Sequence, residues 1–176
     1  MSQQRIPISV EILADMETPL SVFKKLGNQP YSYLFESVEG GEKWARYSLI
    51  GLPASTVIKI FNNEIQIWED GKIIEELTSE DPLKFLEAYQ ENIKVKVNEE
   101  LPGFTGGLVG YLGYDCIRYI EPRLSQSNLP DPLGTPDALF MLSEEVAVFD
   151  NLNNNCLLYT SPSPRDQRGS RIPSSA

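Results

Sequence analysis

Four side chains that can bind a small charged molecule stand close together in the sequence. Glu36 and Ser37 precede a polar loop, and Arg46 and Ser48 follow it. An arginine guanidinium binds carboxylates through paired N–H groups, and a glutamate carboxylate binds an ammonium group. With the two hydroxyls, these charges could hold an amino-acid zwitterion. Alternatively, Glu36 and Arg46 form an ordinary cross-strand ion pair, and the residues alone leave both interpretations open.

A β-hairpin is the simplest element that would bring these side chains together. Residues 31–35 and 46–50 are rich in aromatic and branched side chains, as strands are. Between them, Gly40 and Gly41 can take the positive φ angles that a chain reversal needs. The pattern therefore predicts two antiparallel strands with the polar side chains at the roots of a long loop.

The residues outside this hairpin offer little catalytic chemistry. The chain has no histidine, which removes the usual general base and most zinc sites. The adjacent acids Glu99 and Glu100, and likewise Glu144 and Glu145, would point to opposite faces of a strand. Cys116 lies in an apolar segment with no base nearby in the sequence. The residues themselves therefore predict no catalytic and no metal-binding group.

Composition limits the class of protein and its partners. The chain has 176 residues, 41% of them hydrophobic, which suits one globular domain. Its formal net charge of −10 predicts that it binds neither nucleic acid nor an anionic membrane. No apolar run has the length of a signal or membrane-spanning segment, and Cys116 and Cys156 suggest no disulfide framework. We therefore expect a cytoplasmic protein.

The order of the other elements predicts an α+β fold, mainly antiparallel sheet with packed helices. Turn signals separate strand-like and helix-like patterns. The strand-like patterns cover residues 6–13, 31–35, 46–50, 55–61, 64–68, 72–77, 103–111 and 138–149; the helix-like patterns cover 18–27, 81–93 and 114–120. The glycines of residues 103–113 are interpreted as sites of close packing, because neither phosphate-binding glycine spacing is present.

The last part of the chain differs in composition. Residues 156–176 are rich in serine, proline and arginine and lose all periodicity after Tyr159. We expect one folded region over residues 1–155 and a disordered tail over residues 156–176. The tail resembles translated adaptor sequence, which predicts that it is not native and that the natural protein continues beyond Asn155.

Three segments together resemble the N-terminal region of anthranilate synthase component I. They are YLFESVEGGEKWARYSLIG, FTGGLVGYLGYDCIRYIEPRL and GTPDALFMLSEEVAVFDNL, in family order and at family-like spacing. The resemblance implies part of a layered α/β/β/α sandwich. It also implies a cytoplasmic, magnesium-dependent enzyme of tryptophan biosynthesis, which converts chorismate and ammonia to anthranilate and pyruvate. A glutamine amidotransferase subunit would supply the ammonia, and tryptophan would inhibit allosterically.

The same resemblance assigns roles to the hairpin residues. It implies that Ser37 binds the effector tryptophan, with Leu34, Glu36 and Arg46 in the same pocket. Phe35 stands where many members have leucine, a conservative difference. The chorismate, magnesium and catalytic sites of the family lie in a C-terminal region that this sequence lacks, so we expect this part to bind no metal and to be inactive alone. Aminodeoxychorismate synthase component I, or a non-enzymatic amino-acid-binding module, is the alternative.

Overall fold

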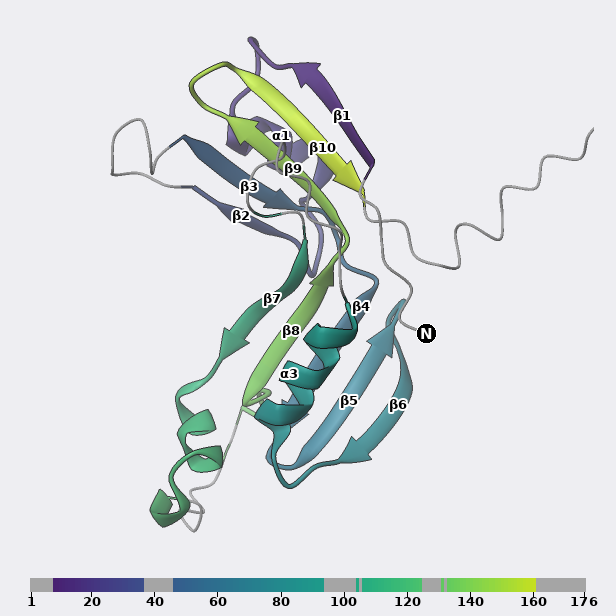
Figure 1. Cartoon of the computed structure of the whole chain (residues 1–176), viewed down its shortest axis with the longest axis vertical. Coiled ribbons are helices and arrows are strands. Elements are labelled where there is room, and N and C mark those ends of the chain that lie inside the picture. The colour runs from purple at the N-terminus through teal and green to yellow at the C-terminus, as the bar shows by residue number, and fades with distance from the viewer. Residues whose placement is uncertain are drawn as a thin grey trace, which may run out of the picture. The chain divides into compact units, whose positions relative to one another are not determined.

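The chain divides into two compact units, each with its own five-stranded sheet (Figure 1). The computed structural model describes residues 8–36, 46–93, 104, 106–124, 131 and 133–160. The first unit comprises Met1–Ala54, Ile93–Gly107 and Ser143–Ala176, and the second comprises Ser55–Asn92 and Leu108–Leu142. The predicted α+β class, mainly antiparallel with few helices, is confirmed.

The sheet of the first unit has the strand order β1-β10-β9-β3-β2, and every neighbouring pair is antiparallel. Its strands are β1 (Ile8–Leu13), β2 (Tyr33–Phe35), β3 (Tyr47–Gly51), β9 (Glu145–Asp150) and β10 (Asn155–Thr160). Side chains alternate between two faces, so the sheet contributes to two separate apolar clusters. One cluster includes Ile50, Phe149 and helix residue Val22; the other includes Val148 and Tyr159.

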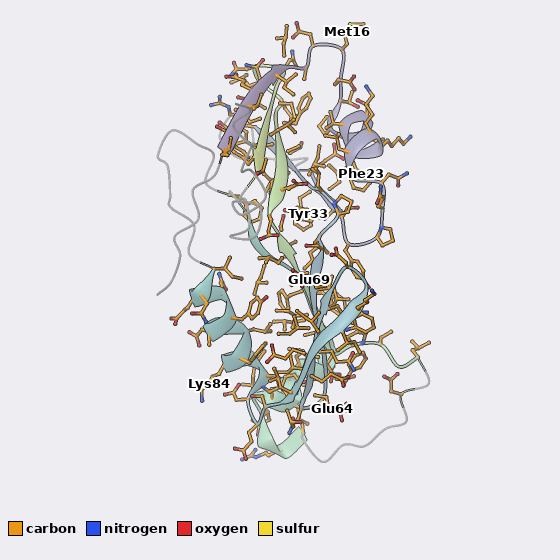
Figure 2. All side chains as sticks on the ribbon, turned by 90° about the vertical axis from the view of Figure 1, so that its right-hand side faces the viewer. Met16, Phe23, Tyr33, Glu64, Glu69 and Lys84 are labelled. Carbon is orange, nitrogen blue, oxygen red and sulfur yellow. The ribbon has the colours of Figure 1, made fainter. Side chains whose placement is uncertain are left out.

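Helix α1 (Pro19–Leu26) packs on the sheet of the first unit through Val22 and Phe23. The predicted boundaries are confirmed: Thr18 caps the amino end in a reciprocal bond pair with Ser21, and Gly27 caps the carboxyl end. Met16, in the loop before α1, points into solvent, whereas Phe23 lies on the helix itself (Figure 2). The helix therefore begins and ends where local signals place it.

Strand β1 is the edge strand at one side of this sheet. Apolar Ile8, Val10 and Ile12 alternate with polar residues along the strand, yet all six residues are exposed. The strand has a single neighbour, β10, and the described residues place no element over it that would cover Ile8 or Val10. The alternating sequence therefore predicted the strand correctly, but it did not show whether another element buries one face of that strand.

In the second unit, the strand-like patterns predicted over residues 55–61, 64–68 and 72–77 form an antiparallel meander. Its sheet has the order β6-β5-β4-β8-β7, made of β4 (Thr56–Phe61), β5 (Glu64–Glu69), β6 (Lys72–Thr78), β7 (Gly107–Leu112) and β8 (Ala138–Ser143). Helix α3 (Pro82–Asn92) lies over one face of this sheet (Figure 1) and packs Leu86 against Ile58 and Ile60. On its outer side Lys84 points into solvent (Figure 2).

The glycine-rich segment serves close packing, as predicted. A Cβ at Gly110 would lie 1.9 Å from the Leu139 carbonyl oxygen and 2.7 Å from the Phe140 Cα, so β7 can approach β8 only with glycine there. The burial of β7 and the type of the helices that follow it were not predicted. The carboxyl half of β7 is exposed because β7 is the last strand of its sheet, and the helices that follow, η1 (Tyr114–Tyr119) and η2 (Pro122–Leu124), are 3₁₀ helices.

The boundary predicted after Asn155 is wrong. Residues 155–160 form β10, which pairs with both β1 and β9 and buries Cys156 and Tyr159. The serine- and proline-rich composition begins only after Thr160, and the residues before it form a short apolar run, 156–159, that was assigned to the tail. The rest of the predicted tail, residues 161–176, lies outside the described residues.

Candidate functional site

The β2–β3 hairpin places three of the four predicted effector residues at one end of the first unit's sheet. The strands pair in the register Leu34↔Ile50 and Phe35↔Leu49, so the chain leaves β2 at Glu36 and returns to the sheet at Arg46. Leu34 packs on the apolar cluster that contains Ile50. Glu36 is exposed. Ser37 lies outside the described residues, so its predicted role stays a prediction.

Arg46 pairs with Asp150, the last residue of β9, and not with Glu36. Its Nε donates to both carboxylate oxygens at 3.1 Å, and its Nη2 donates to Oδ2 at 2.6 Å. The hypothesis of a Glu36–Arg46 cross-strand pair is therefore replaced by a two-pronged bridge across a different strand pair. The reason is register, because β3 pairs with β9 as well as with β2, and Tyr47 lies opposite Asp150.

Asp150 is buried, with only 5% of its surface exposed, and donors surround its carboxylate. The backbone N–H groups of Leu152 and Asn153 donate to Oδ1 at 3.0 and 3.3 Å, and the Asn153 side chain donates to Oδ2 at 3.0 Å. The hydrogen bonds from Arg46, followed by those from the turn amides, hold the pKa of Asp150 below its ordinary value. Asp150 therefore stays charged and closes the turn between β9 and β10.

Ser48 is buried, although the sequence grouped it with the residues that could contact a ligand. Only 1% of its surface is exposed, and its Oγ accepts a hydrogen bond from the Asn151 side chain at 3.1 Å. The backbone N–H of Asn151 also donates to the Arg46 carbonyl at 2.8 Å. Ser48 thus joins the turn to β3 and does not face a ligand from solvent.

The hairpin carries a negative charge, Glu36, at the end of β2 and a positive charge, Arg46, just before β3. Two of the five N–H groups of the Arg46 guanidinium, on Nε and Nη2, bond to Asp150. Nη1 lies in the same plane as Nε and Nη2 and makes neither of these bonds, and 34% of the side chain is exposed. With the exposed Glu36 carboxylate, this arrangement can bind a molecule that carries an anionic and a cationic group.

A polar cavity of about 540 Å³ lies in the second unit. Its lining includes Asp137, whose Oδ2 accepts hydrogen bonds from the Asn62 backbone at 2.6 Å and the Tyr119 hydroxyl at 2.9 Å. Burial, with this hydrogen bond to Asp137, raises the pKa of Tyr119. Arg118 pairs with Asp115 at 2.7 Å. These polar groups mainly bond to one another and tie the β4–β5 turn to η1, which is a structural role.

Neither a metal site nor a membrane-spanning helix occurs in the part of the chain that the structure describes. No three histidine, cysteine, aspartate or glutamate side chains there are grouped as a metal ion would require. No described helix is long and apolar enough to cross a bilayer.

Sequence comparison finds a matching family and several similar proteins. The profile of the family described as chorismate binding enzyme matches residues 31–175. Anthranilate synthase component 1 of Pseudomonas putida is 55% identical over 148 residues, which are 84% of this chain and 30% of that protein. The protein of the same name from Neisseria meningitidis serogroup B is 47% identical over 167 residues, which are 92% of this chain and 34% of that protein.

Comparison with solved structures finds anthranilate synthase component I from Streptococcus pneumoniae TIGR4, with a TM-score of 0.48 and 26% identity over 93% of this chain and 37% of that one. The chain spans about a third of the length of the relatives it matches. Because the profile covers most of the chain, the chain belongs to the chorismate-binding enzyme family, and within that family it is similar to anthranilate synthase component 1.

Proposed function

We propose that this chain is the effector-binding part of an anthranilate synthase large subunit, which acts in tryptophan biosynthesis. The intact enzyme would convert chorismate and ammonia to anthranilate and pyruvate, a lyase reaction. A glutamine amidotransferase subunit would supply the ammonia in the cytoplasm. Chorismate and magnesium would bind in the remaining two thirds of the intact protein. The family match and the identity of 55% to a named anthranilate synthase component support this proposal.

The effector that we propose is tryptophan, bound at the β2–β3 hairpin. The observation that carries this proposal is the separation of charges at the two roots of one loop. Glu36 presents an exposed carboxylate, and Arg46 presents the edge of a guanidinium that Asp150 holds in place. An amino-acid zwitterion fits such a pair, because its ammonium and carboxylate groups need partners of opposite charge. Leu34, on the neighbouring apolar cluster, and Ser37 complete the proposed set.

The test is made in the intact enzyme that contains this sequence, assayed with chorismate and ammonia. Mass spectrometry of the product distinguishes anthranilate from aminodeoxychorismate, and formation of the latter would refute the proposed reaction. A protein that turns over no chorismate would instead support a binding module. Calorimetric titration with tryptophan is then compared between the natural protein and Ser37→Ala. We expect weaker binding by the variant, and unchanged affinity would remove Ser37 from the site.

A further inference from the structure

Asp150 has contacts that go beyond closing a turn. Its carboxylate is nearly buried, yet it reaches the one guanidinium at the root of the effector hairpin. The hydrogen bonds of Asp150 use Nε and Nη2 of Arg46, so they fix both the position and the rotation of the guanidinium plane. A single point charge would leave that plane free to turn. The two-pronged bridge therefore determines which edge of Arg46 a ligand meets.

We propose that Asp150 is a positioning residue of the effector site, which holds Arg46 so that its Nη1 edge receives the carboxylate of the bound amino acid. This inference rests on the proposed function of the hairpin. It assigns Asp150 no contact with the effector, because its own oxygens are occupied by Arg46 and by the turn of residues 151–154. The exposed Glu36 is left to bind the ammonium group.

The burial of Asp150 explains why Arg46 keeps its hydrogen bonds to Asp150 and does not give them up to bind Glu36 or the effector. A buried carboxylate that loses its cationic partner is left poorly solvated, whereas the exposed Glu36 is solvated by water. The main chain reinforces the same geometry, since the N–H of Asn151 donates to the Arg46 carbonyl at 2.8 Å. The turn between β9 and β10 and the start of β3 therefore form one bonded unit around the guanidinium.

The first test measures inhibition of the intact enzyme by tryptophan in the variants Asp150→Asn, Arg46→Lys and the double variant. We expect Asp150→Asn to raise the half-inhibitory concentration by about tenfold or more, within the usual range of coupling between sites. A lysine ammonium lacks the planar guanidinium, so it cannot bond to Asp150 through one edge and offer a second edge to the effector. Arg46→Lys should therefore have a similar effect. Because Asp150 acts through Arg46, the double variant should be no worse than the more affected single variant.

The matched control is Asp115→Asn, which disrupts another arginine–aspartate pair, in the second unit. Its half-inhibitory concentration should equal that of the natural protein. If the natural enzyme is inhibited but Asp150→Asn is inhibited equally, or if the two single effects multiply in the double variant, Asp150 has no positioning role. If the natural enzyme does not respond to tryptophan at all, the proposed effector is wrong and this inference falls with it.

A second measurement needs no variant and therefore does not depend on whether Asp150→Asn folds. Coupling is reciprocal, so a ligand that engages Arg46 must also stabilise the groups that hold Arg46. Saturating tryptophan should slow hydrogen exchange at the amides of Leu152 and Asn153, which bond to Asp150, in the natural enzyme. Protection in β2 and β3 without any change in the turn of residues 151–154 would overturn the inference.

Discussion

The substitution Asp150→Asn tests how much the Arg46–Asp150 bridge stabilises the first unit. Asparagine keeps one acceptor oxygen but replaces the other with an NH₂ group, which would face N–H donors on either side of the carboxylate. Hydrogen bonds to a charged group contribute about 1.5–3 kcal/mol each. Arg46 is one-third exposed and can be rehydrated, which offsets part of that loss. We therefore expect Asp150→Asn to lower the free energy of unfolding by about 2 kcal/mol.

Thermal unfolding followed by circular dichroism measures this loss. For a chain of this length, about 2 kcal/mol corresponds to a decrease in Tm of roughly 4–8 °C. The matched control is again Asp115→Asn. The Asp115 side chain is 54% exposed and accepts a hydrogen bond from Arg118, so the loss of this pair should cost less than about 0.5 kcal/mol. If the two variants melt at the same temperature, burial of Asp150 does not strengthen its pair and the reasoning fails.

The pH dependence gives an independent check. Arg46 and the turn amides hold the pKa of Asp150 below its ordinary value of 3.8, so the folded state binds the proton less tightly than the unfolded chain. The stabilisation is therefore fully present above about 3.8 and is lost as the pH falls through the lowered pKa of the folded state. The difference in stability between the natural protein and Asp150→Asn should stay constant from neutral pH to about pH 5 and shrink below pH 4. A difference that grows under acid conditions would contradict the direction of the shift.

Two further substitutions test the packing of the sheets. Gly110→Ala would place a methyl group against backbone atoms of β8, so we expect more than about 3 kcal/mol of destabilisation in thermal unfolding. The control Gly71→Asn, at a turn with φ +77° and open space, should change stability by less than about 1 kcal/mol. Tyr33→Phe removes the 2.9 Å bond to the buried Ser143 hydroxyl and should cost about 1–2 kcal/mol. The double variant Tyr33→Phe/Ser143→Ala should lose less than the sum of its single variants, and simple additivity would show that the bond contributes nothing.

Local signals in the sequence were sufficient for elements whose determinants lie within a few residues. Thr18 and Gly27 bound α1 because capping bonds reach only three or four positions along the chain. The meander from β4 to β6 was predictable because its turns contain Asn62, Asp70 and Gly71, all with positive φ. The hairpin strands were predictable from their aromatic and branched residues.

The partner of Arg46 was not predictable in this way. Asp150 lies 104 positions further along the chain, and it reaches Arg46 only because β3 inserts between β2 and β9. A single sequence contains no signal for that strand order, and Glu36 was the nearer candidate. Strand β10 was missed for a related reason. Its pairing with β1 and β9 shows that it is a strand, whereas its own short sequence runs directly into the serine- and proline-rich tail.

The strand order also makes the two roots of the effector hairpin unequal. β2 is the last strand of its sheet, is three residues long and has one neighbour, so displacing Glu36 breaks few contacts. β3 has neighbours on both sides, and its start is bonded to Asp150 and Asn151. Moving Arg46 would disrupt those bonds and expose a buried carboxylate. A ligand that draws the two charges together should therefore move Glu36 toward a fixed Arg46, so that a structural response to the effector begins in β2, while β9 and the core beneath it stay in place.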